Sequence, residues 1–190
     1  MPSARAEWAL AKVNLTLRVI GRRPDGYHDL ESLVVFASVG DALTLAAGPR
    51  LMSGVGNLLS PPLKLPRLAA VLVNPRVAVP TKGVFERLAA PRVVRAAKVS
   101  EDYPPPDRAG LIGYLADRGN DLEHPAIALQ PVVAEVLEAL RGLSGCRLAR
   151  MSGSGATCLA LFDSAKAAAA AARALRERKP GWWVRSAMLG

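Results

Sequence analysis

A lysine and an asparagine two residues apart are the first pair of side chains that could do chemistry. Lys12 and Asn14 lie in a run where apolar and polar residues alternate, the period-two pattern of a half-buried strand. Residues two apart on a strand point to the same face. A lysine there can hydrogen-bond a hydroxyl group and offset negative charge, and Asn14 can bind the same ligand. Taken alone, the pattern is also that of an exposed strand lysine.

A tyrosine and a histidine follow a turn and could form one wall of a binding site. Residues 21–26 are rich in Gly, Pro and Asp, which is typical of a turn, and Tyr27 and His28 come next. An aromatic face can stack on a flat ligand, and an imidazole can hydrogen-bond a polar edge. Ordinary surface packing explains the same two residues, so both interpretations stay open.

Two runs of small residues could bind phosphate through main-chain N–H groups. The run at 152–155 (SGSG) lies between two predicted strands, where a tight hairpin turn explains it as well as a phosphate cradle does. The run at 53–56 (SGVG) is not followed by Lys-Ser or Lys-Thr and opens no clear helix. The second run therefore does not predict a phosphate loop.

The composition predicts a folded protein of the cytosol. Hydrophobic residues make up 51% of the 190 residues, which is enough for a buried core. The sequence contains no apolar run long enough to span a bilayer, and residues 1–8 lack the apolar centre of a signal peptide. Cys146 and Cys158 have no spacing typical of a metal site and are expected to be reduced core thiols.

The net charge of +9 attracts polyanions such as nucleic acid, phosphorylated metabolites or anionic lipid. The arginines are scattered along the sequence, whereas a nucleic-acid surface usually gathers its basic residues. The charge is therefore compatible with a compositional bias and does not by itself identify a partner.

The elements that must position these residues begin with an antiparallel arrangement. Strands are predicted over residues 7–19, 33–37 and 41–46. Residues 47–66 contain three Gly and four Pro and are predicted to be a loop, which is unusually long for a compact domain.

From Leu68 onward the pattern predicts a split βαβ, ferredoxin-like plan. The predicted elements are a buried strand at 68–73, a helix at 82–88 capped by Thr81, a helix from Asp107 to Asp117, a helix at 125–143, strands at 146–151 and 157–162, a helix at 165–178 capped by Ser164, and a strand at 182–187. The fold class is therefore α/β (α+β).

Three stretches together resemble the 4-diphosphocytidyl-2-C-methyl-D-erythritol kinases of the GHMP kinase superfamily. They are residues 9–17 (ALAKVNLTL), 21–30 (GRRPDGYHDL) and 150–158 (RMSGSGATC). The corresponding family patterns are P-A-K-x-N-L, G-x-R-x-D-G-Y-H and R-M-S-G-S-G-A. Further matches include Phe85 and residues 120–123 (NDLE), while Leu10 stands where the family has Pro. The ordered set covers most of the chain.

The resemblance implies a GHMP-kinase fold and a particular reaction. The γ-phosphoryl group of ATP, assisted by Mg²⁺, would be transferred to the 2-hydroxyl of 4-diphosphocytidyl-2-C-methyl-D-erythritol in non-mevalonate isoprenoid synthesis. Lys12 would be catalytic, and Asn14 would bind substrate. Tyr27 and His28 would form one wall of the cytosine site, with Phe85 opposite. The implied partner is a small cytidine diphosphate derivative, without nucleic acid or membrane.

Two family segments have no counterpart in this sequence. One is the motif P-x-x-x-G-L-G-G-G-S-S-D-A-A, whose N–H groups wrap the ATP phosphates at a helix N-terminus; the other is G-A-D-V-P, whose Asp works with the lysine. After Leu45, residues 52–56 (MSGVG) resemble a stretch that normally follows both. We therefore predict a large internal deletion, with a truncated kinase region at 1–66, a carboxy-terminal domain at 67–190, no ATP phosphate loop and impaired activity.

Two alternatives remain. The chain could be a non-catalytic remnant of a kinase that binds at most the cytidine part of the substrate, or a basic nucleic-acid-binding module on a ferredoxin-like sheet. The second is disfavoured because the sequence has no K/R-G-F/Y pattern that would place aromatic platforms on an exposed sheet.

Overall fold

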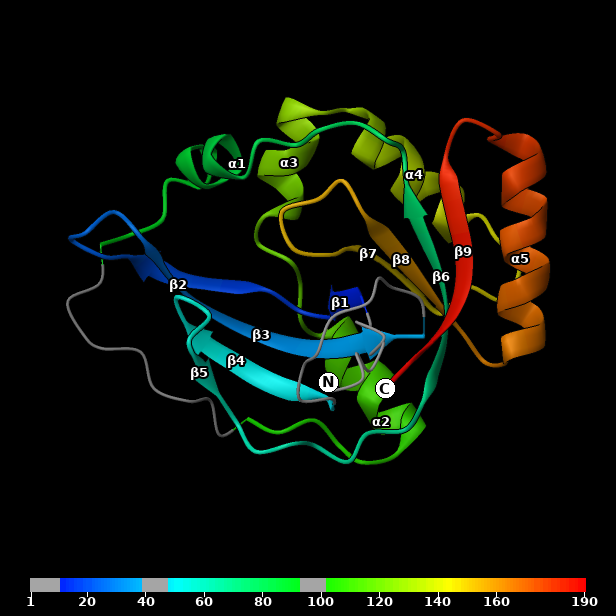
Figure 1. Cartoon of the computed structure of the whole chain (residues 1–190), viewed down its shortest axis with the longest axis horizontal. Helices are drawn as coiled ribbons and strands as arrows, with labels where there is room; N and C mark the ends of the chain where they lie inside the picture. Colours follow the sequence, from blue (N-terminus) through cyan, green and yellow to red (C-terminus); the bar gives the residue numbers. More distant parts are fainter. Residues whose placement is uncertain (1–10, 39–47, 93–101) are drawn as a thin grey trace, which may run out of the picture.

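A single antiparallel sheet, with helices on both faces, organises the molecule (Figure 1). The computed structural model describes residues 11–38, 48–92 and 102–190. Among these, nine strands form one sheet in the order β5-β4-β3-β9-β6-β8-β7, and β1 and β2 also pair with β3. The strands are β1 (Ala11–Asn14), β2 (Arg18–Arg22), β3 (His28–Ala37), β4 (Arg50–Gly54), β5 (Leu58–Leu59), β6 (Leu68–Asn74), β7 (Leu148–Met151), β8 (Cys158–Phe162) and β9 (Trp183–Leu189). The helices are α1 (Thr81–Leu88), α2 (Arg108–Ala116), α3 (Glu123–Leu129), α4 (Val132–Arg141) and α5 (Ala165–Arg178).

The predicted amino-terminal strand is interrupted and becomes β1 and β2. Both pair antiparallel with β3, as the sequence predicts. Between them Leu17 leaves β3, and its main-chain groups bond Gly119 and Asp121 instead. The alternation in the sequence does not reveal this exchange of partner, because Leu17 stays buried in either arrangement. The predicted strand at 33–37 is confirmed within the longer β3, and the predicted strand at 41–46 lies outside the described residues.

The prediction of a loop over 47–66 is wrong, because β4 and β5 lie there. β4 pairs antiparallel with β3, with Leu33 opposite Leu51. Leu51 and Met52 are buried. A tight turn that includes Gly54 and Gly56, both at positive φ, leads into β5. The strand is short and its partner is distant in sequence, so no local periodicity marks it.

The carboxy-terminal part has the predicted split βαβ plan. Its four strands lie in the order β9-β6-β8-β7, and all neighbouring pairs are antiparallel. β6, predicted to be a buried strand from its continuous apolar run, is buried throughout except at Asn74. This part joins the first through Ala37 and Leu189, which pair β3 with β9.

The helix boundaries confirm two predicted caps and correct two other predictions. Asp107 accepts a hydrogen bond from Gly110 N at 2.9 Å, and Ser164 accepts one from Ala167 N at 3.1 Å, as N-caps do. Thr81 does not cap α1, whose N-cap is Pro80. The predicted helix at 125–143 is two helices, α3 and α4, because Pro131 has no N–H to continue the first.

Two hydrophobic cores cover the two faces of the sheet. The first packs α1, α3, α4 and α5 against one face of β6, β8 and β9. The second packs α2, through Leu111 and Leu115, against the other face and against β1, β3 and β4. Helix α2 belongs to the carboxy-terminal part of the sequence but shares its core with the amino-terminal strands. No described helix is both long and apolar enough to cross a membrane.

The two cysteines differ in how deeply they are buried. Cys158 is fully buried, and burial raises its pKa to about 12. Cys146 is partly buried, and burial raises the pKa of its thiol too. Both are free, in agreement with the prediction of core thiols.

The guanidinium of Arg150, on β7, connects three segments from inside the protein. It donates to Leu15 O at 2.9 Å and to Leu115 O at 2.7 Å. Leu15 follows β1, and Leu115 belongs to the last turn of α2. The side chain is buried, and that burial lowers its pKa, while the Glu123 carboxylate acts in the opposite direction.

Replacing Arg150 by Met should lower the free energy of unfolding by about 3 kcal/mol, because two buried carbonyls lose charged donors. Urea denaturation followed by circular dichroism measures the change. Arg147→Met is the matched control, since Arg147 lies on the same hairpin but forms an exposed ion pair with Asp163; its unfolding midpoint should hardly move. Equal midpoints for both variants would contradict the role given to Arg150.

Candidate substrate site

The first cavity of the candidate site lies between β1 and the hairpin that joins β7 to β8. It has a volume of about 330 Å³, and its walls include Lys12, Asn14, Leu72, Trp183 and the run 152–155. The structure thus brings Lys12 and Asn14 together, as predicted from their spacing. Lys12 is exposed, whereas Asn14 is buried.

Asn14 is held in place by both its main chain and its side chain. Its side-chain amide donates to Ser32 Oγ at 2.7 Å, and its main-chain N–H donates to Ser152 Oγ at 2.9 Å. Ser32 in turn donates to Thr16 O. Lys12 lies two residues before Asn14 on the same strand. Its main chain is therefore fixed, while its exposed side chain stays open to a ligand.

The hairpin at 152–155 needs its glycines. Gly153 and Gly155 have φ of +59° and +89°, values that favour glycine. A Cβ on Gly155 would also lie 2.8 Å from Met151 Sδ. The hairpin is closed by the Ser152 N–H, which donates to Thr157 O at 2.8 Å. The tight-turn interpretation is therefore confirmed, and the run also forms part of the wall of the cavity.

The second cavity is an aromatic cleft of about 490 Å³ between the β2–β3 turn and α1. Tyr27, His28 and Phe85 all line it. The rings of His28 and Phe85 are stacked, with centroids 4.6 Å apart and planes 25° apart. Tyr27 is 67% exposed and lies at the rim. A flat ring does not fit between His28 and Phe85 at this separation, so a base would have to stack against Phe85 or Tyr27.

The imidazole of His28 is harder to protonate than that of a free histidine. Burial, and after it the positive charge of Arg22, lower the pKa of the imidazole below 6.5. At neutral pH one ring nitrogen is therefore a donor and the other an acceptor, which suits the polar edge of a pyrimidine.

Thr81 joins the two cavities. It lines the aromatic cleft, and its Oγ1 lies 2.9 Å from Ser154 Oγ of the hairpin. Sequence reasoning assigned Thr81 only a capping role. It also missed Arg22, Lys82 and Glu86, which line the cleft; Glu86 pairs with Lys82 at 3.8 Å, so the three charges together leave an excess of positive charge. Their position beside Tyr27 and Phe85 in the matched motifs is the signal that could have indicated them.

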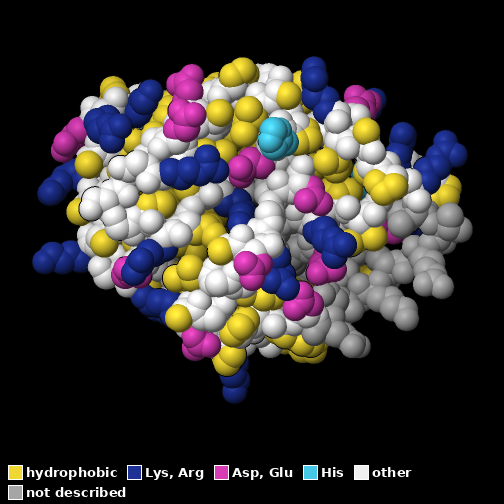
Figure 2. All heavy atoms as spheres, turned by 180° about the vertical axis from the view of Figure 1, so that it is seen from behind, with side chains coloured by type: hydrophobic (Ala, Val, Ile, Leu, Met, Phe, Trp, Pro, Cys, Tyr) yellow, Lys and Arg dark blue, Asp and Glu magenta, His cyan; other side chains and the backbone are white. Residues whose placement is uncertain are grey.

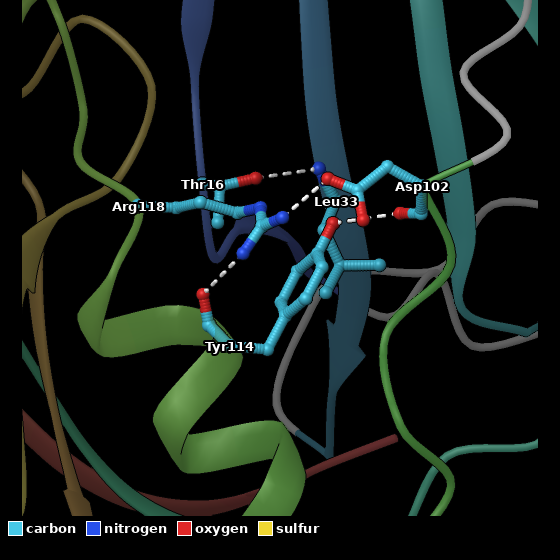
Figure 3. A network of polar contacts seen from close by, with 5 residues as sticks. All are labelled: Thr16, Leu33, Asp102, Tyr114 and Arg118. Carbon is cyan, nitrogen blue, oxygen red and sulfur yellow. Dashed lines mark hydrogen bonds and ion pairs between the residues drawn. The ribbon is translucent and has the colours of Figure 1, made fainter.

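A third cavity, of about 520 Å³, lies between β3 and α2 and differs in charge. Figure 3 shows its polar network: Arg118 pairs with Asp102 and bonds Tyr114 O, while its guanidinium carbon lies 3.6 Å from the centre of the Tyr114 ring. Four carboxylates and two guanidinium groups line this cavity, namely Glu31, Asp102, Asp117, Asp121, Arg18 and Arg118. The excess of carboxylates disfavours a phosphorylated ligand there.

The Mg²⁺ implied by the resemblance would need oxygen ligands, carboxylates among them. The lining of the Lys12 cavity contains no Asp or Glu. In the part of the chain that the structure describes, no three His, Cys, Asp or Glu residues are grouped to hold a metal. The walls of the Lys12 cavity therefore offer no carboxylate to the ion.

The fold and the sequence together place the protein among the GHMP kinases. The family described as "GHMP kinases C terminal" matches residues 107–181. A crystal structure of a 4-(cytidine 5'-diphospho)-2C-methyl-D-erythritol kinase superimposes with a TM-score of 0.72 at 24% identity, over 98% of this chain and 99% of that one. That similarity shows a shared fold.

Whole-chain sequence comparison identifies the family within this class. A 4-diphosphocytidyl-2-C-methyl-D-erythritol kinase of Rhodopseudomonas palustris (strain BisA53) is 36% identical, over 98% of both chains. The enzyme of the same name from Paracoccus denitrificans (strain Pd 1222) is also 36% identical, over 97% of this chain and 96% of its own. The chain belongs to the family of 4-diphosphocytidyl-2-C-methyl-D-erythritol kinases.

The same comparison shows a difference in length. The alignment with the Rhodopseudomonas protein runs over 293 positions, whereas this chain has 190 residues. More than a third of the aligned positions therefore have no residue of this chain opposite them.

The two histidines of the chain allow a direct test of the cleft. We expect one imidazole resonance to titrate below pH 6.5 and to disappear in His28→Gln, because burial and Arg22 oppose protonation. The unfolded chain binds this proton more readily, so the contribution to stability is complete above pH 6.5 and is lost as the pH falls below it. NMR titration of the wild type and the variant measures the effect; a His28 resonance that titrates above pH 6.5 would contradict the described environment.

Proposed function

We propose that this chain binds the cytidine diphosphate part of 4-diphosphocytidyl-2-C-methyl-D-erythritol and has lost the ability to hold ATP for phosphoryl transfer. The observation that carries the proposal is the Thr81–Ser154 contact of 2.9 Å, which places the aromatic cleft beside the Lys12 cavity. An extended ligand with a pyrimidine at one end and hydroxyl groups at the other fits such a pair of adjoining sites.

Each part of the ligand has a chemical counterpart along this path. The base stacks on Phe85 or Tyr27, and neutral His28 hydrogen-bonds its polar edge. Arg22 and Lys82 at the cleft offset the negative charge of the diphosphate. Lys12 and the hairpin hydroxyls then meet the methylerythritol hydroxyls. In the relatives' reaction, a lysine in this place would stabilise charge at the attacking hydroxyl.

The loss of ATP binding is supported by the sequence and the length difference. Phosphoryl transfer depends almost entirely on positioning the phosphate and neutralising its charge. The sequence has no counterpart of the Gly- and Ser-rich segment or of the Asp segment. Since the alignment covers nearly all of both chains, the unmatched positions are internal. We infer that a deletion between Leu45 and Met52 removed them, and that residues 1–66 are the truncated region.

The nucleic-acid alternative has less physical support. A ferredoxin-like sheet that binds RNA leaves one face open for stacking bases, whereas buried residues cover both faces here. On the side shown in Figure 2, Lys and Arg side chains are spread among acidic ones. The net charge of +9 then acts as a general attraction for anions.

We predict negligible kinase activity. Purified protein supplied with ATP, Mg²⁺ and 4-diphosphocytidyl-2-C-methyl-D-erythritol should release no ADP above the background of a boiled sample, because the residues that hold the γ-phosphate are missing. A coupled assay for ADP measures this. Turnover that Lys12→Ala abolishes would contradict the prediction and would show that another segment holds ATP.

We also predict weak binding of cytidine diphosphate. Stacking on an aromatic side chain is worth about 1–3 kcal/mol per base, so the dissociation constant should be near millimolar in order of magnitude. Ligand-observed NMR should show weaker binding in Phe85→Ala and Tyr27→Ala. Tyr103→Ala is the control, because Tyr103 is also exposed but lies outside the cleft. A base-dependent affinity that is equal in all four proteins would exclude the cleft as the site.

A further inference from the structure

Asn120 lies outside the lining of both proposed cavities yet contacts the hairpin between them. It is 8% exposed and lies in the connection between α2 and α3. Its side-chain amide nitrogen donates to Met151 O and to Gly153 O, both at 2.8 Å. Its side-chain oxygen accepts from Leu122 N at 3.0 Å. Three of the hydrogen bonds available to this buried side chain are therefore made.

The two carbonyls that Asn120 binds flank Ser152. Ser152 is the hairpin residue whose hydroxyl accepts the N–H of Asn14 on β1. A single amide group thus fixes the main chain on both sides of the residue that touches β1. Ser154, two residues further along the hairpin, contacts Thr81 of the aromatic cleft.

The main chain around Asn120 is itself attached to the amino-terminal strands. Leu17 N donates to Gly119 O at 3.1 Å, and Asp121 N donates to Leu17 O at 2.9 Å. The Asp121 carboxylate also accepts from Val19 N at 2.7 Å. The hairpin is therefore held from β1 directly, and from the β1–β2 connection through Asn120.

We propose that Asn120 is a positioning residue that sets the distance of the hairpin from Lys12 and thereby shapes the cavity for the methylerythritol end of the substrate. This inference rests on the proposed function, since it assumes that this end of the ligand enters the Lys12 cavity. It adds to the substrate site a residue, Asn120, that contacts neither end of the ligand itself.

The chemistry of the site explains why an amide is needed at this position. Two carbonyl oxygens require two donors from one group, and the NH₂ of asparagine supplies both. An ionised aspartate of the same shape only accepts, so it would present an oxygen to two carbonyl oxygens. Asn120→Asp should thus displace the hairpin while it keeps the size of the side chain.

The experiment compares two probes, cytidine diphosphate and 4-diphosphocytidyl-2-C-methyl-D-erythritol, by ligand-observed NMR. The ratio of their dissociation constants isolates the contribution of the methylerythritol end. In the wild type the full substrate should bind more tightly. In Asn120→Asp this preference should fall about tenfold or disappear, while the affinity for cytidine diphosphate stays within about twofold. A general loss of structure would weaken both probes together.

Asp121→Asn is the matched control, because it lies on the same turn and keeps an oxygen that can accept from Val19 N. It should keep the wild-type ratio. If Asn120→Asp does not fold, Asn120→Ser replaces it, since its shorter hydroxyl supplies at most one donor. Independently of any variant, the side-chain NH₂ resonances of Asn120 in the wild type should shift with the full substrate and not with cytidine diphosphate.

The outcomes separate this inference from the proposed function. If the wild type binds both probes equally, the methylerythritol end is not held in the Lys12 cavity; the inference about Asn120 then fails, while binding of the cytidine diphosphate part still stands. If the wild type binds neither probe, the proposed function fails and the inference fails with it. If the wild type prefers the full substrate and Asn120→Asp keeps that preference, the inference about Asn120 alone is wrong. Unchanged NH₂ resonances with the full substrate would overturn it as well.

Discussion

The arrangement of the two parts of the chain depends on one buried charge. Arg150 extends from β7 to the carbonyls of Leu15 and Leu115, which belong to segments about a hundred residues apart in the sequence. Burial lowers its pKa, but the ordinary value for arginine lies so far above neutrality that the group stays charged. A buried charge needs its hydrogen bonds, so the β1 region and α2 must remain where those carbonyls meet the guanidinium.

The candidate site lies next to the hydrogen bonds that Arg150 makes. The hairpin run 152–155 begins two residues after Arg150, and Leu15 follows the strand that carries Lys12, so the cavity walls on both sides start beside the same anchored residue. The charged residues that line each cavity then determine which ligands it favours. The space between β3 and α2 is lined by more carboxylates than guanidinium groups, whereas the two adjoining cavities have Lys12, Arg22 and Lys82 against one carboxylate, Glu86. A phosphorylated ligand is directed to the latter.

The features that were predicted correctly are those determined by residues close together in the sequence. The apolar run of β6, the caps Asp107 and Ser164 and the hairpin at 152–155 need no distant partner to be recognised. β4 could not be predicted in this way, because its pairing with β3 is non-local and its turn residues resemble a loop. Pro131 is a local signal for the break between α3 and α4, but the helical spacing of the apolar residues around it favoured one continuous helix. Within the site, the motifs indicated Lys12, Asn14, His28 and Phe85, but the contacts of Thr81 with Ser154 and of Asn120 with the hairpin arise only when the chain folds.

The central claim is that the substrate half of the site is present while the grip on ATP is absent. Backbone-resolved NMR tests both parts in one titration series. With cytidine diphosphate, we expect saturable shifts at the amides of Tyr27, His28 and Phe85 that persist at high salt, because stacking does not depend on charge screening. With ATP and Mg²⁺, we expect only small, non-saturating shifts that vanish at high salt. Saturable, salt-resistant shifts with ATP, without any response to cytidine diphosphate, would contradict the account.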